Sequence, residues 1–224
     1  MHAIFFEPPI EQNFLGHQMA EVYRDGVYYP LVEGRTDMTI LDIGANIGVT
    51  TYFFSRYANR VISLEPSTEH FTTLVNMLEF NQIKNVTPIK KALYIKPGSF
   101  TLFKNPNKTM FSLHQAVSDP NLKPEEVETI TLATLFEEQK IDKVDLMKLD
   151  VEGSEVEILS HTDFVDLAPR IEKIILERHA WSGRHPQQTV DALEYAGYKV
   201  SQIKGNADLL LGVYENKKTD TPTP

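Results

Sequence analysis

The chain has 224 residues, 42% of them hydrophobic and 24% charged, which is the balance of an ordinary globular protein. Its formal net charge is −9 and it contains no cysteine. A disulfide framework, a thiolate zinc site and a cysteine nucleophile are therefore excluded, and a nucleic-acid substrate held by its backbone charge is disfavoured. The sequence has no run of about 18 apolar residues and no basic start of the signal-peptide type, so we expect a soluble, cytoplasmic protein without a membrane span.

The length and the alternation of strand-like and helix-like segments predict one domain, spanning residues 38–215. Residues 1–37 are expected to form an N-terminal extension or cap beside the ligand site, in which residues 11–24 fit a short amphipathic helix and residues 25–37 are rich in turns. The alternative for this extension is a simple lid over the core. Residues 216–224 are expected to be a disordered tail.

Met38–Tyr57 (MTILDIGANIGVTTYFFSRY) has the pattern of strand, glycine loop and helix that opens a nucleotide-binding α/β domain. Gly44 permits a sharp turn at the strand end, and Gly48 is expected to let the first helical turn approach a ligand. Asn46 stands where a dinucleotide fingerprint needs its middle glycine, and the P-loop lysine is absent. The acid Asp42 suits a cationic ligand such as S-adenosylmethionine. The alternative is a plain strand–helix turn.

The next predicted strand ends in Glu65-Pro66, 21 residues after Gly44. An acid about 20 residues after the glycines of a nucleotide-binding unit accepts hydrogen bonds from ribose hydroxyls, and the adenosine of S-adenosylmethionine carries the same two hydroxyls. The helix that follows includes His70, which we expect to be solvated. A third strand is predicted from Val86 to Leu93, at a sheet edge because Pro88 cannot donate a backbone hydrogen bond.

Residues 97–135 interrupt the alternation and predict a β-rich insertion, with short strands at 98–103 and 129–132. We expect a mobile segment around residues 108–114 that contacts the substrate, since such loops commonly do. The alternative is a plain surface excursion.

Residues 143–155 (KVDLMKLDVEGSE) predict a central parallel strand that runs into a helix. Lys148, Asp150 and Glu152 are two apart, so they share one side of the strand while it persists, at the carboxyl end where ligands bind in open α/β sheets. Burying three charged groups is costly unless they pair or serve a ligand. We therefore predict a catalytic or substrate-binding cluster; the alternative is a structural ion pair between Lys148 and Asp150.

The strand after it, residues 171–179, ends in Glu177 and His179, which would complete the polar cluster if the two strands are neighbours. His185 is expected to lie in a loop. A helix at 187–196 and two strands at 198–204 and 209–214 follow, and the short link between these strands predicts an antiparallel hairpin.

LDIGANIG, the acid of SLEP, and KLDVEGSE with the downstream LERH resemble the FkbM family of S-adenosylmethionine-dependent methyltransferases, over roughly residues 38–215. KxDVEGxE is the most specific of these motifs, because many methyltransferases share the glycine loop. The resemblance implies a class I, Rossmann-like α/β fold with a seven-stranded, mostly parallel sheet, an antiparallel last strand and helices on both faces. It also implies O-methylation of a hydroxyl on a sugar, glycolipid or other natural product.

The residues expected to bind the cofactor are Asp42, Gly44, Ala45, Asn46, Gly48, Glu65, Pro66 and Asp150. The residues expected to act in catalysis are Lys148, Asp150, Glu152, Glu177 and His179. A base must remove the proton of the acceptor, and among Asp150, Glu152 and His179 the histidine is best matched to neutral pH. No metal is expected, although the same carboxylates and histidine offer an alternative site for a divalent cation. The alternative functions are a nicotinamide-dependent oxidoreductase and a catalytically inactive binding protein.

Overall fold

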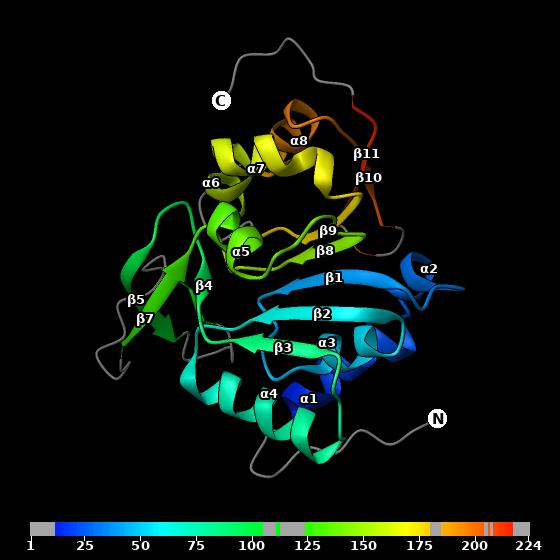
Figure 1. Cartoon of the computed structure of the whole chain (residues 1–224), viewed down its shortest axis with the longest axis vertical. Helices are drawn as coiled ribbons and strands as arrows, with labels where there is room; N and C mark the ends of the chain where they lie inside the picture. The colour runs from blue at the N-terminus through cyan, green and yellow to red at the C-terminus, as the bar shows by residue number, and fades with distance from the viewer. Residues whose placement is uncertain are drawn as a thin grey trace.

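The computed structural model describes residues 12–104, 111–112, 124–179, 185–203, 206 and 208–216. Its centre is a seven-stranded sheet in the order β10-β11-β9-β8-β1-β2-β3 (Figure 1). The strands are β1 Met38–Ile43, β2 Ala58–Leu64, β3 Val86–Ile89, β8 Leu146–Leu149, β9 Lys173–Glu177, β10 Tyr198–Gln202 and β11 Leu209–Tyr214. All neighbouring pairs are parallel except those of β11, which runs antiparallel to both β9 and β10. The predicted sheet with its antiparallel last strand is confirmed.

The central strands are buried on both faces, as their continuous apolar sequences require. In β1, Ile40, Leu41 and Ile43 are each at most 1% exposed. The edge position predicted for Pro88 is also confirmed, because it lies in β3, the last strand of the sheet order.

Helices cover both faces of this sheet (Figure 1). One face carries α5 Leu132–Glu138, α6 Glu155–Ser160, α7 Thr162–Leu167 and α8 Pro186–Tyr195, with a short 3₁₀ turn at Ala168–Arg170. The other carries α3 Val49–Ser55 and α4 Thr68–Phe80 together with the N-terminal segment, which comprises α1 Gln12–Met19, the π-helical turn η1 Ala20–Arg24 and α2 Tyr29–Val32. Alternate residues of each strand therefore face two separate apolar clusters.

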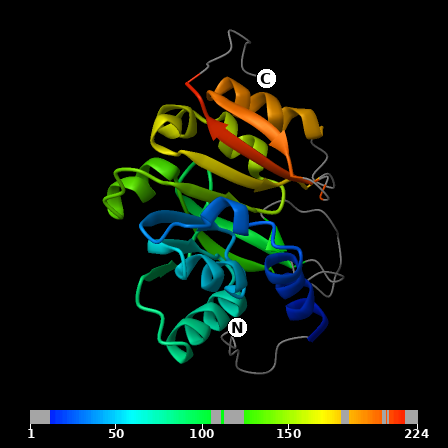
Figure 2. The same cartoon turned by 90° about the vertical axis from the view of Figure 1, so that its right-hand side faces the viewer.

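The N-terminal segment is part of the packed structure, and its predicted helix is found at residues 12–24. Val22, Tyr28 and Val32 are at most 2% exposed and pack with Phe53 and Phe54 of α3. Figure 2, turned by 90°, shows this segment beside the helices of the same face. Among the described residues no helix has both the length and the apolar character needed to cross a bilayer.

A second, four-stranded sheet in the order β4-β7-β5-β6 lies beside the carboxyl ends of β1, β2 and β3 (Figure 1). Its strands are β4 Ala92–Leu93, β5 Gly98–Lys104, β6 Phe111–Ser112 and β7 Glu125–Ile130. The predicted strand at 98–103 is confirmed.

Two further strands in this region were predicted in the right place but with the wrong bounds. The strand expected at 129–132 runs instead over β7, because Thr131 caps helix α5 by accepting a hydrogen bond from the backbone N–H of Thr134. The strand expected at 86–93 is divided in two. The N–H of Lys91 donates to the carbonyl of Ile89, which ends β3 and directs β4 into the second sheet.

Some predictions fall wholly or largely outside the described residues. The segment 108–114 is described only at β6, and the tail only at its first residue. The division of the chain into extension, domain, insertion and tail stays a prediction.

Candidate active site

The glycine loop joins β1 to α3 at the carboxyl edge of the sheet. Gly44 has φ +79°, and a Cβ there would lie 1.8 Å from the backbone oxygen of Asp150, so no other residue fits. The N–H groups of Gly44 and Ala45 donate to the carbonyl of Leu64 at 3.0 and 2.9 Å, which ties the loop to β2. Asn46 adopts φ +52°, a left-handed conformation that asparagine tolerates better than most residues. The loop is thereby fixed against both neighbouring strands.

Gly48 has a packing role, and the ligand approach expected for it stays a prediction. Its φ is +96°, and a Cβ would lie 2.6 Å from Leu74 Cδ1 and 2.5 Å from Met77 Cε. Both side chains belong to α4, so the space that Gly48 leaves is used for packing α3 against α4.

Glu65 follows β2 and is 5% exposed. Its Oε2 accepts the N–H of Asn46 at 2.8 Å and its Oε1 accepts the N–H of Ser67 at 2.9 Å. Burial raises the pKa of Glu65 to about 7, although both backbone N–H groups oppose that rise. The carboxylate therefore holds the glycine loop against the segment that follows β2.

Asp42 and Lys148 form a buried pair behind the glycine loop. Asp42 is fully buried, and its Oδ2 accepts the hydroxyls of Thr50 and Thr51 at 3.0 and 2.6 Å. Lys148 Nζ lies 3.8 Å from Asp42 Oδ1 and 3.0 Å from Asp150 Oδ2. Asp42 thus lies in the interior beneath the glycine loop, where it holds the start of α3 and Lys148.

Lys148 holds Asp150 in position through their ion pair, because a buried ammonium group needs a charged partner. Nζ also donates to the carbonyl of Gly44 at 3.0 Å. Burial would lower the pKa of Lys148, but Asp150 and Asp42 outweigh burial and raise it. The side chain is therefore charged throughout the physiological range. The Lys148–Asp150 ion pair, which was the alternative to a functional cluster, is present and lies next to the remaining candidates, so the functional cluster stays a prediction.

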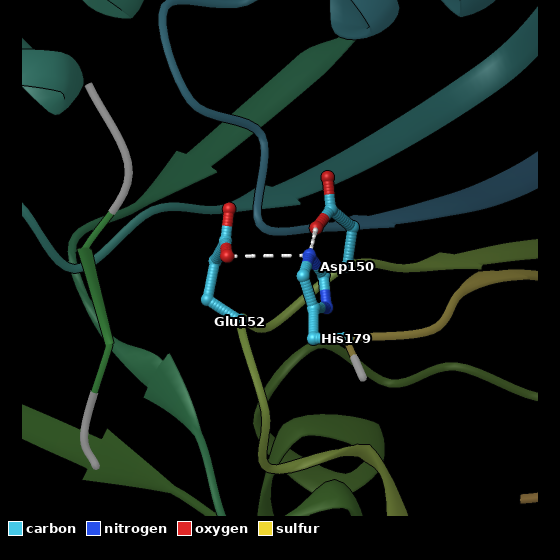
Figure 3. A group of neighbouring side chains, drawn as sticks. All are labelled: Asp150, Glu152 and His179. Carbon is cyan, nitrogen blue, oxygen red and sulfur yellow. Dashed lines mark ion pairs between the residues drawn. The ribbon is translucent and has the colours of Figure 1, made fainter. Parts of the chain in front are cut away.

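Asp150, Glu152 and His179 converge on one point (Figure 3). His179 Nε2 lies 3.2 Å from Glu152 Oε2 and 3.7 Å from Asp150 Oδ1. β8 ends at Leu149, and Glu152 has φ +55°, so these side chains meet through the turn that follows the strand rather than by alternation along it. The structure thus brings the predicted residues together by a different local geometry.

His179 is oriented from behind by Glu155, a residue that the sequence analysis did not select. Glu155 is 3% exposed, and its Oε1 lies 2.7 Å from His179 Nδ1. The same oxygen accepts the N–H of Gly153 at 3.1 Å, which fixes the turn carrying Glu152. The DVEGSE motif therefore supplies both the acids facing Nε2 of the imidazole and the acid behind it.

These neighbours change the protonation of the cluster. Burial would lower the pKa of His179, but the hydrogen bond to Glu155 and the charges of Glu152 and Asp150 raise it to about 9. Burial, with Asp150, raises the pKa of Glu152 to about 8. At neutral pH the imidazole of the ligand-free protein is therefore protonated. It can act as a base only after it has lost that proton. The pKa of His179 is thus not close to neutral pH, contrary to the prediction.

Glu177 lies at the end of β9, which neighbours β8, so the condition set for its joining the cluster is met. Burial raises its pKa to about 7, and the charges of Asp150 and Glu21 act in the same direction. It belongs to the same electrostatic cluster, with the N-terminal Glu21 as an additional member.

The ligand atoms of Asp150, Glu152 and His179 lie within 4.8 Å of one another, close enough to hold one metal ion. Two carboxylates and an imidazole suit divalent ions such as Mn²⁺ or Fe²⁺. Ion pairs between the imidazolium and the two carboxylates explain the same distances. The divalent cation thus remains an alternative.

A pocket with about 570 Å³ of empty space, part of it open to solvent, is lined by Asp150 and Glu152 of this cluster but not by His179 or Glu177. It extends from the glycine loop and Glu65 to the turn after β8 and the β4 strand of the second sheet. It is lined by Ile43, Gly44, Asn46, Leu64, Glu65, Pro66, His70, Lys91, Ala92, Leu93, Leu102, Asp150, Val151, Glu152 and Ser154. A pocket of this size at the carboxyl edge of parallel strands is the usual place for a ligand in such sheets.

His70 was wrongly expected to be solvated. It is 5% exposed and lies in the first turn of α4, where its Nδ1 is 3.9 Å from Glu65 Oε1. The N-cap Ser67 fixes the start of this turn by accepting the N–H of His70. His185, expected in a loop, caps α8 and accepts the N–H of Gln187 at 3.2 Å.

Comparison with known proteins decides the family. The profile of the methyltransferase FkbM domain matches residues 42–200, more than half of the chain, including the glycine loop, Glu65 and the KLDVEGSE motif. The chain belongs to the FkbM methyltransferase family.

This FkbM methyltransferase is similar to a hexuronic acid methyltransferase, AglP, of Haloferax volcanii, with 24% identity over 195 residues, covering 86% of this chain and 77% of that protein. Among solved structures it resembles the methyltransferase FkbM of Methylobacillus flagellatus, with a TM-score of 0.58 and 16% identity over 88% of this chain. The match spans about half of that protein (48%).

The precorrin-6y C5,15-methyltransferase of Geobacter metallireducens shares the fold with a TM-score of 0.50 and 13% identity, covering 85% of this chain and 87% of that one. At these identities the structural likeness shows the fold alone. The fold is that of the class I, Rossmann-like methyltransferases, as the resemblance implied.

Proposed function

We propose that this methyltransferase uses S-adenosylmethionine and transfers its methyl group to a hydroxyl of a sugar, glycolipid or small natural product. The observation that carries the proposal is the excess of buried carboxylates at the pocket. Glu65 and Glu152 line the pocket, and burial raises their pKa values to about 7 and about 8; burial also raises the pKa of Glu177, which acts electrostatically on Glu152, to about 7. Each of these groups favours a nearby positive charge over further negative charge. The pocket therefore favours a cationic ligand over a pyrophosphate.

Individual residues of the pocket suit individual parts of the cofactor. Glu65 lies at the end of β2, where an acid accepts hydrogen bonds from ribose hydroxyls, and each of its oxygens retains a lone pair beyond its backbone bond. Pro66 and Asn46 line the same wall. Bound in the pocket, S-adenosylmethionine would supply an electrophilic methyl group on a positively charged sulfur. Glu65, Asn46 and the glycine loop would hold it.

The Glu152–His179 pair is placed to receive the proton of the acceptor hydroxyl. The 3.2 Å between Oε2 and Nε2 allows one proton to be held between the two groups. A positive charge brought into the pocket lowers the pKa of both groups and favours loss of that proton, so a base becomes available when the cofactor is bound. Asp150, held by Lys148, would orient the acceptor beside this pair.

The relative named for hexuronic acid supports a sugar as the acceptor. A sugar acid offers two kinds of oxygen, the hydroxyls and the carboxylate. The acidic cluster favours the neutral hydroxyl, because a carboxylate would add a further negative charge beside Asp150 and Glu152.

The experiment follows methyl label from S-adenosylmethionine into a panel of neutral glycosides and uronic acids. We expect label that survives mild alkali, since methyl ethers are stable there and methyl esters hydrolyse. His179→Ala should lower transfer ~100-fold or more, as loss of a general base does, with S-adenosylhomocysteine affinity retained. Alkali-labile label would identify a carboxylate acceptor and overturn the hydroxyl assignment. Binding without transfer to any acceptor would favour the inactive binding protein.

A further inference from the structure

A groove lined mainly by aromatic side chains lies between α3 and the N-terminal segment, and we call it the aromatic groove. It has about 960 Å³ of empty space, part of it open to solvent. It is lined by Val22, Tyr23, Gly26, Tyr29, Pro30, Tyr52, Phe53, Arg56 and Tyr57. These residues are all different from those that line the main pocket, so the aromatic groove is a separate site.

The walls of the aromatic groove are rings set at steep angles to one another. Tyr23 meets Phe53 edge to face, with ring centroids 5.8 Å apart and ring planes at 80°. Tyr29 meets Tyr57 in the same way, at 6.3 Å and 82°. Tyr23 and Tyr29 are 42% and 44% exposed, so a large part of each ring is in contact with water. Clustered exposed rings of this kind are typical of binding surfaces.

Polar groups of the aromatic groove have no partner within the part of the chain that the structure describes. Tyr52 is only 6% exposed, yet its hydroxyl makes no hydrogen bond with a described residue. The hydroxyls of Tyr23 and Tyr57 and the guanidinium of Arg56 are in the same position. Burial and the neighbouring Tyr52 and Tyr57 raise the pKa of Tyr23 while Arg56 opposes that rise, so the four groups lie close together. A largely buried hydroxyl without a partner is costly, which indicates that a ligand supplies one.

The charge of the aromatic groove is opposite to that of the main pocket. Of the described residues that line the groove, Arg56 alone is charged, and it is exposed. The groove therefore favours an anion, whereas Glu65, Asp150 and Glu152 make the main pocket unfavourable for one. A glycan that carries both neutral hydroxyls and carboxylates can satisfy the two sites at once.

The chemistry of the lining selects a sugar among anionic ligands. A lipid chain would cover the rings but leave the tyrosine hydroxyls and the guanidinium unpaired. A sugar unit has faces of C–H groups that pack on aromatic rings, and it has hydroxyls around its rim that both donate and accept hydrogen bonds. A uronic acid unit adds a carboxylate, which a guanidinium binds through paired hydrogen bonds.

We propose that the aromatic groove binds an acidic sugar unit of a glycan acceptor, with Tyr52 hydrogen-bonded to a sugar hydroxyl and Arg56 paired with a carboxylate. The inference rests on the proposed function, because it takes the acceptor to be a saccharide. α3 has seven residues, so roughly 10 Å separates the groove from the glycine loop, a distance that an oligosaccharide spans. The hydroxyl to be methylated then enters the main pocket while an acidic unit farther along the glycan is held in the groove.

The test is calorimetric titration of the full chain with a tetramer of galacturonic acid and, as its neutral counterpart, maltotetraose. We expect the acidic tetramer to bind ~10-fold or more tightly than maltotetraose. Arg56→Gln should weaken binding of the acidic tetramer ~10-fold or more, because a charged hydrogen-bond partner is removed. Tyr52→Phe should weaken it about 3-fold or more, because that variant removes the hydroxyl and keeps the ring.

Arg24→Gln is the matched control. Arg24 is an exposed arginine of the N-terminal segment that pairs with Asp25 and lies outside the groove lining, so its substitution tests the effect of net charge alone. It should change the affinity for the tetramer less than ~2-fold. S-adenosylhomocysteine is titrated against the same proteins, and its affinity should change less than ~2-fold in Arg56→Gln and Tyr52→Phe, because neither residue lines the main pocket.

The outcomes separate the aromatic groove from the proposed cofactor. A wild type that does not bind the tetramer, or equal tetramer affinity in Arg56→Gln and the wild type, would overturn the inference. An equal loss in Arg24→Gln would also overturn it, and so would a dimer in sedimentation velocity that Arg56→Gln dissociates, since a second copy would then cover the groove. A wild type that binds the tetramer but not S-adenosylhomocysteine would overturn the proposed cofactor and leave the inference standing.

Discussion

Glu155 controls the protonation of His179 from the side away from the pocket. Its carboxylate is 2.7 Å from Nδ1 and holds that nitrogen as a donor, which leaves Nε2 facing Glu152 and Asp150. We expect Glu155→Gln to lower the pKa of His179 from about 9 toward the ordinary histidine range, because a charged partner is replaced by a neutral one. Nuclear magnetic resonance titration of the His179 ring protons measures this change.

Glu157→Gln serves as the control, since it removes a carboxylate from the same helix, two residues farther on. The imidazole titration should be the same in Glu157→Gln as in the wild type. If Glu155→Gln leaves the titration of His179 unchanged, Glu155 supports only the turn and does not position the imidazole.

The residues of this cluster were partly predictable. Asp150, Glu152 and His179 follow two buried strands, and the carboxyl ends of neighbouring parallel strands meet at one edge. Glu155 was missed because it begins a helix, where an acid is ordinarily explained by the helix dipole. Glu21 was missed because nothing local in the sequence shows that an N-terminal helix will come close enough to act on Glu177.

Helices α3 and α4 meet at Gly48, which makes this glycine a packing residue. We expect Gly48→Ala to lower the free energy of unfolding by about 2–3 kcal/mol, since its Cβ would press on Met77 and Leu74 and its φ is unfavourable. In protein that remains folded, S-adenosylhomocysteine affinity should change less than about 3-fold, because the added methyl faces α4 rather than the pocket. Denaturant unfolding and calorimetric titration measure the two quantities.

Gly34→Ala is the matched control, because Gly34 also has positive φ, +75°, but nothing within 4 Å of its added Cβ. The difference between the two variants isolates the steric contact from the backbone strain. A Gly48→Ala variant that keeps its stability and loses ligand affinity would restore the original prediction of close ligand approach.

Helices and strands were predicted best where a single sequence pattern, such as an apolar run bounded by turn residues, covered the whole element. The strands β1, β2, β8, β9 and β11 are apolar runs bounded by turns, and the edge strand follows from Pro88. The second sheet was predicted less well, because β4 is two residues long and its division from β3 depends on a single turn at Lys91. Burial of His70 could not be predicted from helical spacing alone, since it depends on Glu65 from another element.

The molecule as a whole carries an excess of buried acid at one edge of its sheet, and its stability should depend on pH accordingly. The folded-state pKa values of Glu65, Glu152 and Glu177 are about 7, 8 and 7, against 4.5 ordinarily, and that of His179 is about 9, against 6.5. In each case the folded protein binds the proton more tightly than the unfolded chain. Stability is therefore lost as pH rises through this range.

We expect the Tm of the ligand-free protein to fall by roughly 5 °C or more between about pH 6 and about pH 9. Scanning calorimetry at fixed ionic strength measures this fall. Glu152→Gln should reduce it, because that variant removes one group whose pKa is raised. A Tm that stays constant or rises over this interval would show that the buried acids are already compensated in the folded protein.

The fold brings β1, β2, β8 and β9 to one edge, so that the glycine loop, Glu65, Asp150 and Glu152 line one pocket, with His179 in contact with Glu152. The most direct test is calorimetric titration with S-adenosylhomocysteine and with NAD, using the wild type, Glu65→Gln and, as control, Glu69→Gln, an exposed acid nearby. We predict that S-adenosylhomocysteine binds, that NAD does not, and that Glu65→Gln alone weakens binding ~10-fold or more. NAD binding in place of S-adenosylhomocysteine, or equal affinity in Glu65→Gln and the wild type, would contradict the assignment of this pocket.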